Sequence, residues 1–114
     1  MLTIENLKEL GANVDEGLGR CFGNEALYLR LVGMGLADAH FDGLREALDA
    51  GDPKAAFEAA HALKGVLANL ALTPILTPIS EMTESLRGKT DEVDVEALYA
   101  QMKEALDKAR ALAE

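Results

Sequence analysis

The segment from Pro53 to about Leu72 constrains the fold most, because its apolar residues recur with the period of an α-helix. At roughly 100° per residue around the helix axis, six apolar residues lie within about 60° of one direction: Ala56, Ala59, Leu63, Val66, Leu67 and Leu70. His61 stands at the opposite pole, outside the apolar stripe. The pattern predicts an amphipathic helix that faces a core and turns His61 to solvent.

Helix stop and start signals divide the rest of the chain. Gly51-Asp52-Pro53 combines a residue suited to the end of a helix with an N-cap and a first-turn proline. Asn24 is a candidate N-cap for a long helix from Glu25 to about Ala50, weakened in its middle by Gly33 and Gly35. The helical period predicts that this helix turns one apolar face to the core, formed by Leu27, Leu31, Met34, Phe41, Leu44 and Leu48.

Similar signals predict the remaining elements. Two short helices are expected, from Thr3 to Leu10 and from Asp15 to Cys21. Thr73-Pro74 and Thr77-Pro78 each resemble a cap followed by a first-turn proline, so one of them begins a helix that runs to about Arg87 and ends at Gly88. Lys89 to Val93 is expected to be a loop, followed by a last helix that Asp94 caps.

These elements predict an all-α fold. Four substantial helices with short connections favour an antiparallel up-down four-helix bundle, with the short N-terminal helices covering one end or side. With 114 residues, the chain is expected to form one domain, residues 1–114, with a core of its own. Alanine, leucine and glutamate dominate, and there is no tryptophan, which suits helices packed through aliphatic side chains.

Charge and cysteine content exclude several classes of function. The net charge of −9 argues against nucleic-acid partners and against an anionic membrane surface, both of which need clustered basic residues. Cys21 is the only cysteine, so neither a disulfide framework nor a cysteine metal site is available, and a buried thiol is expected. The N-terminal residues have no signal-peptide pattern, and no segment is apolar and long enough to span a bilayer. A cytoplasmic protein is the simplest expectation.

The surroundings of His61 predict a reactive histidine. On the helix, Lys64 falls at about −60° from His61, Gly65 at about +40° and Ala68 at about −20°, so a cation and two small residues share its face. Near neutral pH a solvent-exposed imidazole can attack phosphorus through an unprotonated ring nitrogen. Lys64 offers positive charge to a transferring phosphoryl group, while Gly65 and Ala68 leave room for a second protein. Phe57, at about −40°, is either an exposed anchor for that partner or packed against a neighbouring helix.

The short turn at Gly51 and Asp52 predicts which segment flanks the histidine. In an antiparallel hairpin, the residues from His40 to Arg45 lie opposite His61. Arg45 is a candidate to hold a phosphate and Asp42 to orient the imidazole, although solvated surface charges explain both more simply. His40 itself has no Lys or Gly one turn later, so it is a poor second nucleophile.

These residues resemble the histidine-containing phosphotransfer (HPt) domains of multistep phosphorelays. The family motif, His-x-x-Lys-Gly followed by small residues, stands here from His61 to Ala71, with Ala71 where the family usually has glycine and Val66 where a small or hydroxyl residue is common. The resemblance implies that His61 is phosphorylated, that Lys64 stabilises the phosphohistidine, and that Gly65 keeps the site open. It also implies receiver domains of response regulators or hybrid histidine kinases as partners. The receiver supplies the acidic pocket and the Mg²⁺, so no cofactor or metal is expected on this chain.

Three other interpretations remain open. The phosphoacceptor domain of a chemotaxis-type histidine kinase has a similar motif, but this chain has no segment that resembles an ATP-binding domain. A helical interaction module that carries no phosphate would leave His61 as an ordinary surface residue. A metal enzyme is disfavoured because the two histidines, His40 and His61, fall on different expected helices without cysteines to support a metal site. As a relay component, the chain would turn over no small molecule, and nothing requires more than a monomer.

Overall fold

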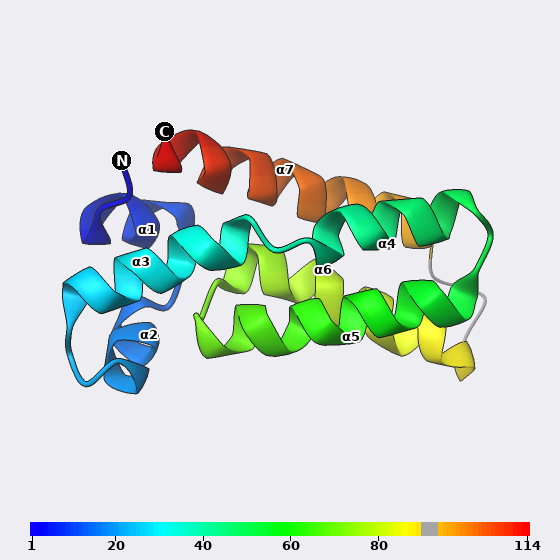
Figure 1. Cartoon of the computed structure of the whole chain (residues 1–114), viewed down its shortest axis with the longest axis horizontal. Helices are drawn as coiled ribbons and strands as arrows, with labels where there is room; N and C mark the ends of the chain where they lie inside the picture. Colours follow the sequence, from blue (N-terminus) through cyan, green and yellow to red (C-terminus); the bar gives the residue numbers. More distant parts are fainter. Residues whose placement is uncertain (90–93) are drawn as a thin grey trace.

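The computed structural model describes residues 1–89 and 94–114, and all regular elements in these ranges are helical (Figure 1). The all-α prediction is therefore confirmed. The elements are α1 (Ile4–Leu10), α2 (Val14–Arg20), α3 (Glu25–Leu36), α4 (His40–Asp49), α5 (Pro53–Asn69), α6 (Thr73–Glu84), the π-helical turn η1 (Ser85–Lys89) and α7 (Val95–Ala113). Within the described ranges, no helix has both the length and the apolar character needed to cross a membrane.

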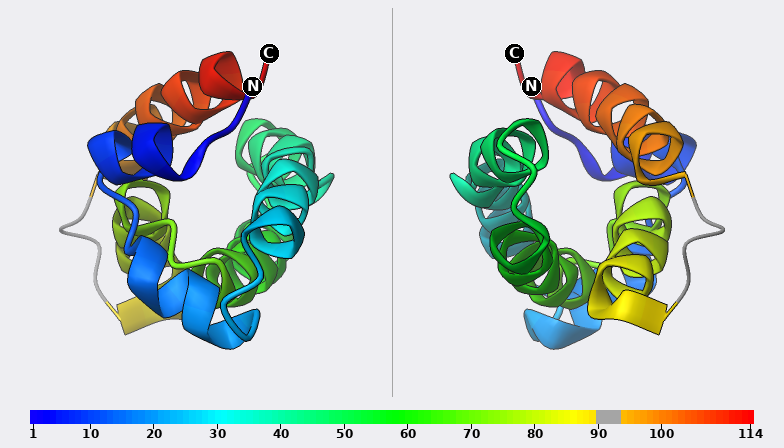
Figure 2. Two further views of the ribbon diagram at one scale, coloured as in Figure 1. Left: turned by 90° about the vertical axis from the view of Figure 1, so that its left-hand side faces the viewer. Right: turned by 90° about the vertical axis from the view of Figure 1, so that its right-hand side faces the viewer.

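The longer helices pack side by side around one core. α4 packs against α5, α5 against α6, and α6 against α7. Seen along the long axis of the molecule, α7, α6, α5 and the α3–α4 pair surround a common centre (Figure 2). The short helices α1 and α2 lie at the end where the chain begins, and α1 also contacts α7.

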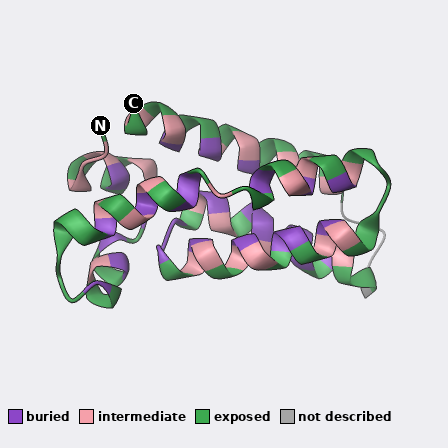
Figure 3. Ribbon diagram, in the orientation of Figure 1, coloured by how far each residue is buried: buried purple, intermediate pink, exposed green. Residues whose placement is uncertain are grey.

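The core is mostly aliphatic and extends through all the longer helices (Figure 3). On α5 it takes up the predicted stripe: Leu63 and Leu67 are fully buried and Val66 is half-buried. Cys21 is buried, as expected. The largest fully buried side chains are Tyr28, Leu7, Leu44, Leu63, Leu67, Leu72, Ile75, Ile79, Met82, Met102, Leu106 and Val14.

The turn between α4 and α5 confirms the predicted stop and restart. Gly51 has φ +66°, in the left-handed region that glycine adopts without strain. The Asp52 carboxylate accepts a hydrogen bond from the backbone N–H of Ala55 at 3.1 Å, and Pro53 is the first residue of α5. This cap fixes where α5 starts and therefore which residues its third turn presents.

The single long helix predicted from Glu25 to Ala50 is wrong, since the chain breaks between Leu36 and His40. The Asp38 carboxylate accepts a hydrogen bond from the backbone N–H of His40 at 2.8 Å, an N–H that a continuous helix would have used internally. The carbonyl left free at Leu36 accepts from Arg110 Nε of α7 at 2.9 Å. Both new partners satisfy groups that a helix end leaves open.

The break also changes which face of α3 is buried. The predicted face is wrong there: Met34 is 61% exposed and Leu27 is 37% exposed. Tyr28 and Val32 are fully buried instead, and the Tyr28 hydroxyl donates to the Leu70 carbonyl at 2.8 Å. The prediction fails in α3 because it assumed one continuous helix. The break between Leu36 and His40 rotates the buried face of α3 relative to that of α4.

The start of α6 also differs from the expectation that a threonine caps it. Leu72 occupies the N-cap position without a side-chain hydrogen bond, and Thr73 is already helical. Pro78 lies inside the helix, although it cannot donate a backbone hydrogen bond. Burial outweighs this loss, because the core-facing stripe of α6 includes Pro78 itself along with Ile75, Ile79 and Met82.

α5 ends at Asn69, three residues before the expected end at Leu72. Most of the remaining expected boundaries hold to within about one residue, the usual uncertainty of helix ends. α1 and α2 occupy the predicted positions, and Asn24 caps α3 by accepting from the Leu27 N–H at 3.0 Å. Gly88 has φ +85° and interrupts the helical backbone one residue before the end of η1. The loop predicted from Lys89 to Val93 lies outside the described residues apart from Lys89, the last residue of η1. Asp94 caps α7, as predicted.

Candidate functional site

His61 lies in the middle of α5 with its side chain exposed. The opposite side of the helix is held in the core by Leu63 and Leu67, both fully buried. One turn after His61, Gly65 is exposed, and a Cβ atom added to it would meet no heavy atom within 4 Å. A rigid helix thus presents an accessible imidazole beside a stretch of bare backbone.

The imidazole ring is stacked on a neighbour from the preceding turn. The ring centroids of Phe57 and His61 are 5.7 Å apart and the ring planes differ by 13°. Phe57 is half-buried, and the guanidinium carbon of Arg87 lies 5.3 Å from its ring centroid, which is a cation–π distance. Phe57 is therefore packed between the side chains of His61 and Arg87, while part of it stays accessible.

Lys64 lies in an ion-pair cluster next to the histidine. Its Nζ is 3.9 Å from Oε1 of Glu84 on α6, and an Arg87 nitrogen is 3.7 Å from the same carboxylate oxygen. All three side chains remain partly exposed, at 37%, 57% and 42% respectively. Lys64 and Arg87 therefore share one carboxylate at the edge of the face that carries His61.

Sequence reasoning missed Glu84 and Arg87 as neighbours of the site. Glu84 is the last residue of α6 and Arg87 belongs to η1. Their distance to α5 depends on how far the α5–α6 connection displaces one helix along the other, which helical periodicity does not determine. An open groove of about 490 Å³ continues beyond them toward the start of α5, lined by Pro53, Lys54, Phe57, Leu86, Arg87 and Gly88.

Beyond Gly65, the same face of α5 stays small until the helix ends. Ala68 is half-buried, and Asn69 is exposed, with its side-chain Oδ1 accepting a hydrogen bond from an Arg20 guanidinium nitrogen at 3.4 Å. Ala71, just after the helix, has φ +56°. A left-handed residue at this position explains why glycine suits it, because a Cβ atom there is strained.

The segment from His40 to Arg45 does not supply the polar groups expected beside His61. Arg45 donates to Glu96 of α7 at 2.8 and 3.0 Å and to Asp49 at 2.6 and 3.0 Å, and its guanidinium carbon lies 4.5 Å from the ring centroid of Tyr99. The hydrogen bond from Arg45 lowers the pKa of the Glu96 carboxyl.

These partners hold Arg45 at α7, so the simpler interpretation as a surface charge fits Arg45 and its candidate role as a phosphate ligand is not supported. Asp42 is exposed, and no hydrogen bond joins it to His61 within the described residues. His40 Nδ1 lies 2.7 Å from the Asp38 carboxylate.

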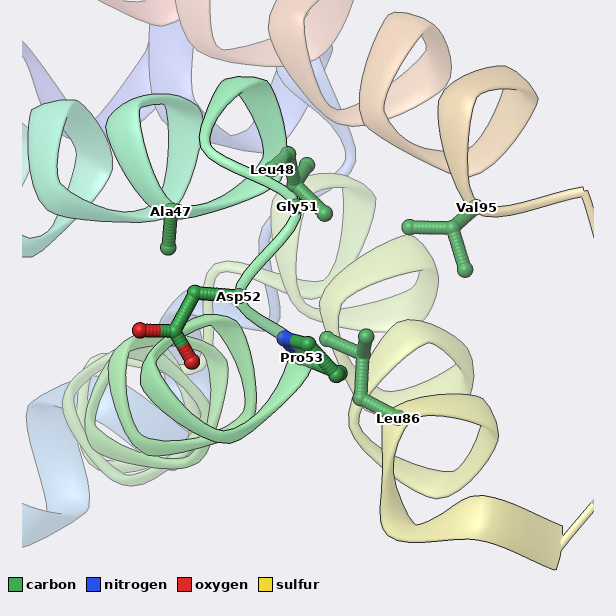
Figure 4. Close-up of a pocket in the computed structure, with 7 residues that line it drawn as sticks. All are labelled: Ala47, Leu48, Gly51, Asp52, Pro53, Leu86 and Val95. Atoms are coloured by element: carbon green, nitrogen blue, oxygen red, sulfur yellow. The ribbon is translucent and has the colours of Figure 1, made fainter.

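An apolar pocket of about 220 Å³ lies at the α4–α5 turn (Figure 4). Its one ionisable side chain, Asp52, is already engaged as the cap of α5. The lining residues are Ala47, Leu48, Gly51, Asp52, Pro53, Leu86 and Val95. Nothing in this lining is nucleophilic, so His61 remains the centre of the candidate site. In the described part of the chain, no three His, Cys, Asp or Glu side chains cluster as a metal site would require.

Comparison with known proteins agrees with this geometry. The curated proteins and the solved structures that were compared gave no match. A family model described as the Hpt domain matches residues 35–112, well over half of the chain, including all of α4, α5 and α6. The chain therefore belongs to the Hpt domain family, whose members transfer phosphoryl groups through a histidine in phosphorelays.

Proposed function

We propose that this chain is a phosphorelay intermediate that accepts a phosphoryl group on His61 from a receiver-domain aspartate and passes it to another receiver. The observation that carries the proposal is the exposed imidazole on a core-anchored helix, with Lys64 and the bare backbone of Gly65 one turn away. Donors and acceptors of this kind occur in response regulators and hybrid histidine kinases. No small molecule is turned over in such a relay.

The transfer is a displacement at phosphorus. The lone pair of a His61 ring nitrogen forms the new N–P bond, the bond between phosphorus and the aspartyl oxygen breaks, and the aspartate leaves as a carboxylate. In the reverse direction, a carboxylate oxygen attacks phosphorus and the bonding pair returns to the ring nitrogen. The stack on Phe57 limits how far the imidazole can rotate, which favours attack along one direction.

Each neighbouring side chain has a distinct part in this proposal. The ammonium of Lys64 compensates the negative charge that the phosphoryl group brings. Gly65 and Ala68 leave the receiver room to approach closely, because neither has a side chain beyond Cβ. Phe57 offers the receiver the exposed part of its ring while it holds the imidazole from the other side.

We propose an antiparallel up-down four-helix bundle for the scaffold, with the α3–α4 pair, α5, α6 and α7 as its members. Residues 1–114 then form one domain, since Leu7 of α1 is fully buried and the Tyr28 hydroxyl bonds to the end of α5. We further propose that the protein acts as a cytoplasmic monomer and binds no nucleic acid, in keeping with its net charge of −9.

Transfer from a phosphorylated receiver tests the function directly. The native protein and His61→Gln are mixed separately with a receiver domain that carries a radiolabelled phosphoryl group. The acid-labile label transferred to each of the two proteins is then measured over time. Label on the native protein alone, with unchanged circular dichroism for the variant, is the expected result. Label that persists on His61→Gln would show that another residue carries the phosphate.

A further inference from the structure

Among the residues that the structure describes, Glu84 is the one whose carboxylate lies against both cations beside His61. Its Oε1 lies 3.9 Å from Lys64 Nζ and 3.7 Å from an Arg87 nitrogen. Arg87 also contacts the residue stacked on His61: its guanidinium lies over the Phe57 ring, and that ring is stacked on the imidazole. The unphosphorylated site therefore contains its own counter-charge.

We propose that Glu84 competes with the phosphoryl group for Lys64 and Arg87, and thereby shortens the lifetime of the phosphohistidine and raises its readiness to transfer. The inference rests on the proposed function of His61. It assigns two residues of the α6–η1 segment to that reaction, Arg87 as a second cation for the phosphoryl group and Glu84 as the residue that restrains both cations.

The competition follows from charge and reach. A phosphoryl group on His61 carries up to two negative charges and lies one helical turn from Lys64, so it attracts the ammonium more strongly than a single carboxylate does. Lys64 and Arg87 have long, partly exposed side chains and can turn from Glu84 to the phosphoryl group without a change of backbone. Glu84 remains close by, where its negative charge repels the phosphoryl group. Lys64 and Arg87 therefore still pair with Glu84 for a fraction of the time.

The competition affects stability of the phosphohistidine because hydrolysis and transfer both break the same bond. In hydrolysis a water oxygen attacks phosphorus, the N–P bond breaks with its electron pair returning to the ring nitrogen, and inorganic phosphate leaves. Cations that neutralise the phosphoryl oxygens stabilise the phosphohistidine and so slow the breaking of its N–P bond. An exposed ion pair contributes modestly, so replacing Glu84 should lengthen the half-life by about two- to fivefold.

The test uses phosphoramidate, a small donor that labels exposed histidines without any receiver. The ring nitrogen forms a bond to phosphorus while the N–P bond of the donor breaks and ammonia leaves. After removal of the donor, the decay of the phosphohistidine signal is followed by ³¹P NMR in the native protein, Glu84→Gln, Arg87→Gln and Glu81→Gln. Glu81 is exposed one turn earlier on α6, so its variant loses the same charge away from the ion-pair cluster.

The proposal expects a longer half-life in Glu84→Gln, a shorter one in Arg87→Gln and little change in Glu81→Gln. The gain in Glu84→Gln should shrink at high salt, since salt screens charges at this distance. Equal half-lives in Glu84→Gln and the native protein, a shorter half-life in Glu84→Gln, or an equal gain in Glu81→Gln would each overturn it. Failure of the native protein to take label from a phosphorylated receiver would contradict the proposed function instead, and is measured separately.

Discussion

At Gly65, the effect of a side chain on receiver docking can be measured separately from its effect on protein stability. A Cβ atom at this position meets nothing within 4 Å, and the residue lies inside α5 with φ outside the left-handed region. Alanine is favoured over glycine in a helix by about 0.5–1 kcal/mol. Gly65→Ala should therefore raise the free energy of unfolding by about this amount, and the melting temperature by about 2–4 °C.

Docking should respond in the opposite direction. A larger side chain at Gly65 stands beside His61, in the path of any protein that must bring an aspartate to the imidazole. An overpacked contact costs about 1–3 kcal/mol, which weakens association by a factor of roughly 5 to 150. Gly65→Leu should thus keep its helix content and lose most of its transfer rate, measured with a phosphorylated receiver at concentrations below saturation.

Gly33 provides the matched control. It lies inside α3, and a Cβ atom there also meets nothing within 4 Å. Gly33→Leu should transfer phosphate at the native rate. If Gly65→Leu transferred as fast as Gly33→Leu, or if Gly65→Ala were clearly less stable than the native protein, the reasoning about an open face would be refuted.

Two further predictions concern stability. Gly17→Ala should lower the free energy of unfolding by about 1–3 kcal/mol, because the added Cβ would lie 2.3 Å from Cε1 of the fully buried Tyr28; urea unfolding checks this, and Gly19→Ala, whose Cβ meets nothing, should show no such loss. Glu96→Gln should cost no more than about 1 kcal/mol at neutral pH, because the carboxylate is well exposed. The hydrogen bond from Arg45 lowers the pKa of Glu96, so its contribution is present above the unfolded-state pKa and disappears as the pH falls through the folded-state pKa. Stability curves of the native protein and this variant should therefore converge in acid, and a gap that widened there would contradict the assignment.

Local chemistry determined most of the helix boundaries. Asn24, Asp52 and Asp94 each accept a hydrogen bond from a backbone N–H three residues later. Such caps involve only neighbouring residues, so their sequence signal is direct. The exposure of His61 was predictable for the same reason, because one helix period is enough to separate the imidazole from the buried stripe.

The surroundings of the histidine were only partly predictable. Lys64 and Gly65 follow His61 within one helical turn and share its face by helix geometry alone. Glu84 and Arg87 come from a helix whose offset along α5 is set by packing. Arg45 is the converse case: an antiparallel hairpin suggested that it flanks His61, but Glu96 and Asp49 hold it at α7.

The sequence by itself determined an all-helical chain, the positions of its caps and the helix face that carries His61, since each depends on residues within a few turns of one another. Only the tertiary structure decided that the helix predicted from Glu25 to Ala50 breaks before His40. There Arg110, distant in the sequence, donates to the Leu36 carbonyl while Asp38 accepts from the next helix. The same packing buries Tyr28 in place of Leu27 and brings Glu84 to Lys64. These outcomes depend on how whole helices pack against one another. Long-range contacts outweigh local helix preference where they provide hydrogen-bond partners for the backbone groups at a helix break or bury more apolar surface.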